Sequence, residues 1–244
     1  MSDSERIVLV IGGSGGIGRR VAARLAADGM TVVVHYAGNP APAEETAKQI
    51  IADGGAAGTA QADITDPQQV RDLFDTVERE FGGVDVVVNT AGVMILSPLT
   101  EMDVEDFDTM QRINVRGAFL LSQQAARRLR NGGALINFAS TVRKLALPTY
   151  AAYTASKAAV EALTPILAKE LRGRDITVNA VAPGPTATPF FLDGKRPEVI
   201  DGMAKAAPLE RLGEPDDAAE VVAFLAGPAR WVNGQTIFVN GGVI

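Results

Sequence analysis

The chain lacks cysteine altogether and has a single histidine, and both shortages limit the chemistry open to it. Of its 244 residues none is Cys, and His35 is the only His. Without Cys there is no disulfide, no thiolate nucleophile and no zinc site built on sulfur. With one His, a multi-histidine metal centre is excluded and a Ser-His-Asp triad would have to use His35. We therefore predict no metal site and expect acid–base chemistry from hydroxyls, amides, carboxylates, Lys or Arg.

A basic excess and a long apolar run are also missing. The 23 basic residues are outnumbered by 29 acidic ones, which gives a net charge of −6 and weighs against a nucleic-acid surface. No apolar run approaches the roughly 20 residues of a membrane span. Residues 1–6 are polar and acidic, unlike a signal peptide. We expect a cytoplasmic protein without nucleic-acid or membrane partners.

Short β-branched runs alternate along the chain with longer segments of helical period. This alternation predicts an α/β protein with a doubly wound parallel sheet of about seven strands and helices on both faces, a Rossmann fold. The length is that of one domain, 1–244. The strands are expected over 6–11, 31–36, 84–89, 134–139, 176–182 and 235–239, with a weaker seventh over 55–62. The helices are expected over 17–28, 43–53, 68–81, 104–130, 151–171 and 216–225.

The least regular segment is 183–208, which carries five prolines and follows the end of a strand. Such a segment in this architecture is typical of a lid over a site, and we expect a substrate lid around 184–208. The alternative is an ordinary surface loop with a short helix.

A glycine-rich run, IGGSGGIGRR, follows the first predicted strand and opens the first helix. It fits GxGxxG at residues 13, 15 and 18, and GxxxGxG at residues 12, 16 and 18. Both patterns let the backbone approach a pyrophosphate at a helix start. A nucleoside-triphosphatase loop would need Lys and Ser or Thr where Arg19 and Arg20 stand. The cofactor contacts expected here are Gly12, Ser14, Gly15, Gly16, Ile17 and Gly18.

The end of the second strand indicates which dinucleotide is bound. An acidic residue about 20 positions beyond the loop would bind the ribose 2′-hydroxyl of NAD. No carboxylate stands there, and His35, Tyr36 and Asn39 are possible hydrogen-bond donors to a 2′-phosphate. We predict NADP(H), with NAD(H) still possible. Alternatively, His35 is a partly shielded residue at the strand end.

Tyr153 and Lys157 are four residues apart at the start of a long helical pattern, so their side chains share one helix face. Tyr has an ordinary pKa of about 10. A neighbouring ammonium lowers that pKa, which predicts Tyr153 as a general acid/base near neutral pH. A Tyr and a Lys at this spacing are also common by chance.

Together with the glycine loop, these motifs resemble the short-chain dehydrogenase/reductase family over nearly the whole chain, and especially members similar to 3-oxoacyl-carrier-protein reductases. The similarity rests on Gly12-x-x-x-Gly16-x-Gly18, Asn89-Thr-Ala91-Gly92, Tyr153-x-x-x-Lys157 and the 13 residues from Ser140 to Tyr153. The resemblance implies four catalytic residues, Asn114, Ser140, Tyr153 and Lys157. It further implies cofactor contacts from Asp63, Ile64, Asn89, Ala91, Gly92, Tyr153, Lys157, Pro183, Gly184, Thr186 and Thr188.

The same resemblance implies an NAD(P)(H)-dependent oxidoreductase that acts on a carbonyl or alcohol. The substrate oxygen would lie between Ser140 and Tyr153 while hydride moves to or from nicotinamide. Lys157 would hold the nicotinamide ribose and Asn114 a water. A reductase of a ketone, an aldehyde or a 3-oxoacyl group is the first choice. The alternatives are a non-catalytic NADP(H)-binding sensor or scaffold, and an NAD-dependent sugar or polyol dehydrogenase.

Substrate and partners are indicated less directly. Apolar residues of the lid and of a neighbouring loop form either a pocket wall or part of the core: Leu145, Leu147, Phe190, Phe191 and Leu192. Five arginines form either a docking patch for an acidic acyl carrier or plain solvated charges: Arg127, Arg128, Arg130, Arg172 and Arg174. By resemblance, a homotetramer or homodimer is expected, paired through the long helices.

Three positions depart from the expected pattern. Ile11 and Thr90 replace the Thr and the Asn usual in the family, so we expect weaker supporting hydrogen bonds at both. Pro165 falls inside the helix that carries Tyr153 and predicts a kink beyond Lys157.

Overall fold

A computed structural model describes residues 6–244, and its centre is a parallel sheet. Residues 1–5, on which most of the prediction about a signal peptide falls, lie outside the described part. The strands of the sheet are β1 (Ile7–Ile11), β2 (Thr31–Tyr36), β3 (Ala56–Gln61), β4 (Val86–Asn89), β5 (Ala134–Phe138), β6 (Thr177–Pro183) and β7 (Thr236–Val239). All pairings are parallel, in the order β3-β2-β1-β4-β5-β6-β7. The predicted seven-stranded sheet is confirmed, including its weakest strand.

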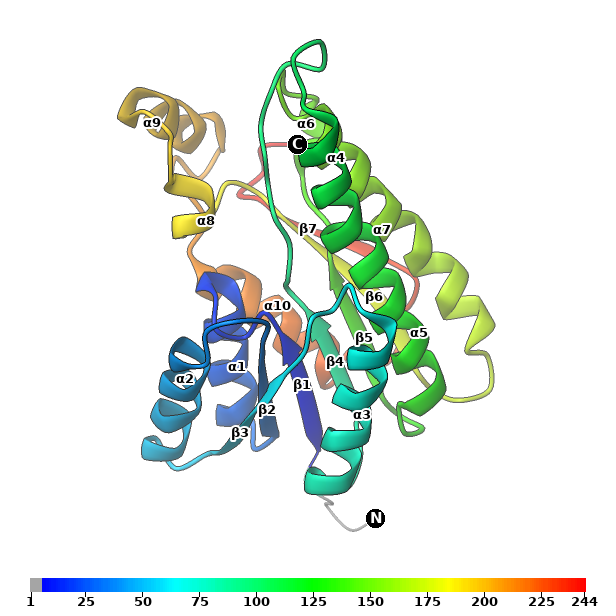
Figure 1. The fold of residues 1–244 in the computed structure, drawn as a ribbon. Coiled ribbons are helices and arrows are strands. Elements are labelled where there is room, and N and C mark those ends of the chain that lie inside the picture. The colour runs from blue at the N-terminus through cyan, green and yellow to red at the C-terminus, as the bar shows by residue number, and fades with distance from the viewer. Residues whose placement is uncertain (1–5) are drawn as a thin grey trace.

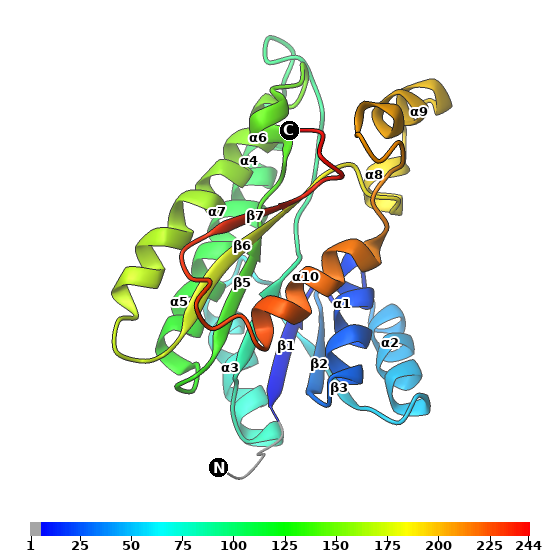
Figure 2. The same cartoon turned by 180° about the vertical axis from the view of Figure 1, so that it is seen from behind.

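Helices cover both faces of the sheet, as predicted (Figure 1). In the described chain they are α1 (Gly16–Ala27), α2 (Ala41–Ala52), α3 (Pro67–Phe81), α4 (Val104–Met110), the π-helix η1 (Gln111–Gly117), α5 (Ala118–Arg128), α6 (Val142–Leu145), α7 (Ala151–Glu170), α8 (Pro189–Leu192), α9 (Pro197–Ala206) and α10 (Pro215–Ala226). One face packs against α1, α2 and α10 and the other against α3, α5 and α7. Figure 2 shows α10 beside α1 on the rear face.

The central strand β1 is apolar at every position because both of its faces are covered. Along β1, Val8 and Val10 belong to the core under α1 and α10, whereas Leu9 and Ile11 belong to the core under α3 and α5. All of these side chains are fully buried. A continuous apolar run is therefore the sequence signature of a strand in this sheet.

The helix predicted over 104–130 is confirmed as a continuous helical segment that ends at Arg128. The π-helical part within it was not predicted, and it divides the segment into α4, η1 and α5. Apolar spacing cannot reveal the division because a π-turn shifts the helical register by one residue while the apolar stripe continues. Such π-turns are rare and occur mainly at functional sites. Asn114 lies in the middle of η1.

The chain reverses direction across the sheet between β1 and β4, and ligands bind at the carboxyl ends of the strands at such a switch point. The glycine loop follows β1 here, and the residues after β4, β5 and β6 lie at the same edge. The helices α8 and α9 of the predicted lid stand above this edge (Figure 1). Neither helix contains a fully buried residue.

The arginines predicted as a docking patch lie at the opposite end of the sheet, just before β5 and β6. Arg128 pairs with Asp75 and Glu78 of α3. Arg130 pairs with Asp85, and Arg174 donates to main-chain carbonyls at the end of α5. These three arginines are engaged in ion pairs and main-chain hydrogen bonds and lie away from the crevice, so the docking patch for a carrier stays a prediction that these contacts do not support.

Two remaining expectations concern helices. Pro165 lies inside α7, which continues to Glu170, and both Tyr153 and Lys157 precede it. Within residues 6–244, no helix combines the length and apolar character needed to cross a membrane.

Candidate functional site

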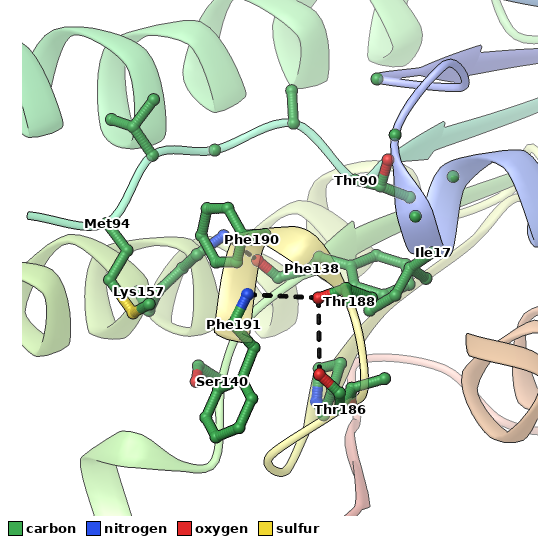
Figure 3. A pocket seen from close by; sticks show the side chains of 18 of the residues that line it. Ile17, Thr90, Met94, Phe138, Ser140, Lys157, Thr186, Thr188, Phe190 and Phe191 are labelled. Carbon is green, nitrogen blue, oxygen red and sulfur yellow. Dashed lines mark hydrogen bonds between the residues drawn. The ribbon is translucent and has the colours of Figure 1, made fainter. Parts of the chain in front are cut away.

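A cavity of about 510 Å³ opens at the carboxyl edge of the sheet and is lined by the segments after β1 to β6 and by the lid. Figure 3 shows side chains of α7, α8 and the end of β5 converging on it. Most of the predicted site residues line it: Gly12, Ser14, Gly15, Gly16, Ile17, Gly18, His35, Tyr36, Asp63, Ile64, Ala91, Gly92, Ser140, Tyr153, Lys157, Pro183, Gly184, Thr186 and Thr188. Asn39, Asn89 and Asn114 do not.

The glycine loop has no room for a side chain at Gly12, Gly13, Gly16 and Gly18. Gly12 has a φ of +72°, and a Cβ on Gly18 would lie 2.2 Å from the Gly12 carbonyl oxygen. A Cβ on Gly16 would lie 2.8 Å from Thr188 of the lid. These constraints favour the GxxxGxG pattern over GxGxxG, because a Cβ on Gly15 meets nothing closer than 3.4 Å.

The two unusual residues beside this loop contact each other. The Thr90 hydroxyl donates a 2.8 Å hydrogen bond to the Ile11 carbonyl oxygen, and Ile11 itself is buried in the core. The expected loss of support at Thr90 is therefore wrong, since this bond joins the end of β1 to the segment after β4.

Tyr153 and Ser140 form a hydrogen-bonded pair at the cavity wall. Burial raises the pKa of Tyr153 above its ordinary value, and the hydrogen bond with Ser140 offsets this only in part. The prediction of a lowered pKa for Tyr153 is therefore wrong. The loss of water around the phenol outweighs any effect of the Lys157 ammonium, whose Nζ lies 6.0 Å from the ring centre. A phenol with a raised pKa stays protonated and is suited to donate a proton.

Lys157 is held at the base of the cavity. Its Nζ donates a 2.8 Å hydrogen bond to the Phe138 carbonyl oxygen at the end of β5 (Figure 3). Burial lowers the pKa of Lys157 to about 8. The side chain is 5% exposed, so its charge faces the cavity and not bulk solvent.

Asn114 and Asn89 are buried behind the cavity wall. The Asn114 side-chain amide makes two 2.8 Å hydrogen bonds with the main chain of Val93, one as donor and one as acceptor. It also donates to Ser156. Asn89 donates to Asn137 and accepts from the Ala91 N–H. Both asparagines therefore shape the wall, and contact of the Asn89 side chain with a ligand is not supported by this placement.

His35 is buried, with 3% of its surface exposed. Its Nε2 lies 2.9 Å from the Ala62 carbonyl oxygen, and its Nδ1 accepts a 3.4 Å hydrogen bond from the Gly12 N–H. This pattern requires the neutral tautomer with the proton on Nε2. Burial lowers the pKa of His35 to about 4. The prediction of His35 as a hydrogen-bond donor to the 2′-phosphate is wrong because both ring nitrogens are already engaged.

Of the other two predicted phosphate donors, only Tyr36 lines the cavity. Asn39 is exposed, and its side chain accepts a 3.1 Å hydrogen bond from the Ala41 N–H at the start of α2. Asp63 lines the cavity and accepts a 2.8 Å hydrogen bond from the Thr65 N–H.

The wall opposite the glycine loop is apolar. Phe190 and Phe191 of α8 line it, with the Phe190 ring 6.5 Å from that of Tyr153. Leu145 and Leu147 line it as well, whereas Leu192 does not. Met94, Tyr150 and Met203 also line the cavity, and none of them was predicted. The sequence offered only their positions as a signal. Met94 follows β4, Tyr150 precedes Tyr153, and Met203 lies in the predicted lid. Among the described residues around the cavity, the charged side chains are Asp63 and Lys157.

Comparison with known proteins gives consistent matches over almost the whole chain. Residues 12–244 match the family described as enoyl-(acyl carrier protein) reductase. A short-chain type dehydrogenase/reductase from Picea abies is 45% identical over 98% of this chain and 92% of its own. An NADPH-dependent aldehyde reductase-like chloroplastic protein from Arabidopsis thaliana is 43% identical over 98% and 94%. The solved structure of the angucycline C-6 ketoreductase LanV with bound NADP is 37% identical over 98% and 95%, with a TM-score of 0.92.

Proposed function

The chain belongs to the short-chain dehydrogenase/reductase family, and from this premise we propose that it is an NADPH-dependent reductase of ketones or aldehydes. The observation that carries the proposal is the Ser140–Tyr153 pair beside Lys157, in a cavity shared by the glycine loop and an apolar wall. These groups bring a proton donor and a dinucleotide-binding loop into one enclosed space.

The lining residues fit a nicotinamide dinucleotide. Gly12, Gly16 and Gly18 leave the backbone free to approach a pyrophosphate at the start of α1. Lys157 would hold the nicotinamide ribose, and Asp63 and Ile64 the adenine. The cofactor would supply the hydride. NADP(H) is favoured over NAD(H) because no carboxylate follows β2 in the cavity wall, and because relatives are described as NADPH-dependent or as binding NADP.

The residues of the chain would bind the substrate oxygen and transfer the proton. Ser140 and Tyr153 would each donate a hydrogen bond to the substrate oxygen, where negative charge develops. Tyr153 would then release its proton to that oxygen. Its raised pKa keeps the phenol protonated until the more basic alkoxide develops on the substrate. Lys157, with a pKa of about 8 and its Nζ 6.0 Å from the centre of the Tyr153 ring, would pass a proton back to Tyr153.

We propose an uncharged, largely apolar substrate. The wall around Tyr153 consists mainly of Met, Leu and Phe side chains together with Tyr150. Within residues 6–244, no arginine lines the cavity to bind a phosphate or carboxylate. A sugar or polyol would leave its hydroxyls without partners on that wall. A carrier-linked 3-oxoacyl chain is less favoured, since three arginines of the predicted docking patch are engaged within the protein. A non-catalytic sensor is disfavoured because the proton-transfer residues are all in place.

The test is a panel of aromatic and aliphatic ketones, aldehydes, sugars, polyols and a 3-oxoacyl thioester, assayed by NADPH and NADH absorbance. We expect apolar carbonyls with NADPH to give the highest kcat/KM. Tyr153→Phe should lower kcat by at least about 100-fold with NADPH binding intact. Tyr150→Phe, which removes a neighbouring hydroxyl, is the control and should stay active. NADPH binding without turnover of any carbonyl would favour the sensor, and faster oxidation of a polyol with NAD⁺ would favour the dehydrogenase.

A homotetramer or homodimer is proposed as well. A groove of about 700 Å³ runs between η1, α5 and α7 and is lined by Val115, Phe119, Leu163 and Ile166 among others. Phe119 and Ile166 are 48% and 56% exposed, so this face fits a second copy of the chain. Light scattering should show an oligomer that Phe119→Glu with Ile166→Glu dissociates. The cytoplasmic location stays a prediction, since one relative is named chloroplastic.

A further inference from the structure

Ser156 lies between the two catalytic residues in sequence and is fully buried, with 0% of its surface exposed. Its hydroxyl donates a 2.7 Å hydrogen bond to the Tyr153 carbonyl oxygen, one turn back on α7. The Ser156 hydroxyl oxygen in turn accepts a 3.0 Å hydrogen bond from the Asn114 side-chain amide of η1. Ser156 does not line the cavity, so it has no contact with substrate or cofactor in the mechanism above.

With the bond to Ser156, both the oxygen and the nitrogen of the Asn114 side-chain amide have their hydrogen-bond partners. One amide hydrogen of Asn114 goes to the Val93 carbonyl oxygen and the other to Ser156, while its Oδ1 accepts from the Val93 N–H. A flipped amide would set its NH₂ group against the Val93 N–H, so the orientation is determined. The result is a three-way connection between the segment after β4, the π-helix and α7.

Lys157 lies against this connection. A Cβ on Gly92 would be 3.2 Å from Asn114 Oδ1 and 3.3 Å from Lys157 Nζ, so both groups face the same residue from one side. The ammonium is held from the other direction by the Phe138 carbonyl oxygen. Any movement of η1 relative to α7 would therefore change the space in which the Lys157 ammonium sits.

We propose that Ser156 is a positioning residue that locks η1 to α7 and so keeps Lys157 and Tyr153 aligned for proton transfer. The proposal rests on the proposed reductase function. Ser156 acts through Asn114 and through the first turn of α7, and takes no part in bond making itself. Without its hydroxyl, one Asn114 N–H is left buried without a partner, and water entering there reaches the surroundings of Lys157.

The test compares Ser156→Ala with Thr164→Val in the full-length protein. Thr164 is also buried on α7 and donates its hydroxyl to the Val160 carbonyl oxygen, two turns beyond the catalytic pair. We expect Ser156→Ala to lower kcat about tenfold and to move the alkaline limb of the kcat–pH profile upward by about one unit, with KM for NADPH within about twofold. Ser156→Cys, which keeps a weak donor and acceptor, should recover part of the loss. Thr164→Val should leave the profile unchanged.

Two outcomes would overturn the proposal. One is a Ser156→Ala enzyme that is less stable but keeps the wild-type kcat and pH profile. That result would assign Ser156 a purely structural role. The other is an Asn114 side-chain amide that exchanges its hydrogens in the wild type as fast as an exposed amide, measured by NMR with Asn114→Asp for assignment. This second measurement decides the case even if the alanine variant does not fold. A wild-type protein that reduces no carbonyl contradicts the proposed function instead, which separates the two failures.

Discussion

Lys157 Nζ donates to the Phe138 carbonyl oxygen across 2.8 Å, which ties the first turns of α7 to the carboxyl end of β5. This contact places a cation at the base of the cavity, where the pKa of Lys157 falls to about 8 because the surrounding atoms exclude water. Four predictions follow from this and other contacts of the site.

The first concerns the stability cost of Lys157. Its pKa is about 8 in the folded protein and 10.5 as an exposed side chain, so between these values the unfolded chain binds a proton that the folded one does not. The free energy of unfolding should therefore rise with pH across this window, by about 3 kcal/mol. Lys157→Met should be inactive yet lack this rise, whereas Lys48→Met, at an exposed position, should keep it. Urea unfolding at pH 7.5 and pH 10 measures the difference.

The second concerns His35, whose pKa is lowered from 6.5 to about 4. The neutral ring is the folded form, so the stabilisation is complete above pH 6.5 and is lost as pH falls towards 4, by about 3 kcal/mol. His35→Asn should lose less over the same range, because carboxylate titrations are common to both proteins. As the only histidine, His35 gives a single imidazole signal by NMR. An imidazole that titrates near 6.5 would show that the ring is not buried as described.

The third concerns the glycine loop. In Gly18→Ala the new Cβ would lie 2.2 Å from the Gly12 carbonyl oxygen, so the loop must move. We expect NADPH affinity to fall more than about tenfold, measured by fluorescence titration. Gly202→Ala is the matched control, since a Cβ there meets nothing within 4 Å and the residue lies in α9. Equal affinity in both variants would place the cofactor elsewhere.

The fourth concerns the lid. Phe190 lines the cavity beside Tyr153, so Phe190→Ala removes apolar contact from the substrate side only. KM for an apolar ketone should rise about tenfold while NADPH affinity stays unchanged. Phe224→Ala, on the exposed face of α10, should alter neither quantity. An equal effect on both ligands would contradict the assignment of this wall to the substrate.

Much of the fold could be predicted from local sequence patterns. Strands buried on both faces are mostly apolar, so β1, β4 and β5 were found near their true positions. Even β3, with little hydrophobic signal, was placed correctly between two helices. The π-helix was missed because its effect on backbone register leaves the apolar pattern unchanged.

The site, like the fold, could be predicted only in part. Tyr153 and Lys157 were identified from residue type and spacing and Ser140 from the family resemblance, and all three line one cavity. The ionisation of Tyr153 was not predictable, because its pKa depends on how completely distant segments exclude water from it. His35 likewise was assigned a phosphate-donor role that its buried hydrogen bonds remove.

The absence of cysteine and the single histidine determined, from the sequence alone, that proton transfer had to rest on other side chains, and the glycine loop determined where a dinucleotide would bind. Only the tertiary structure decided that His35 supports the glycine loop as a neutral ring, that Asn114 is bonded to Val93 and Ser156, and that the arginine patch lies far from the crevice. The reason is physical. Chain connectivity sets which residues share a helix face or a strand end, whereas desolvation and hydrogen-bond pairing are set by residues brought together from across the chain.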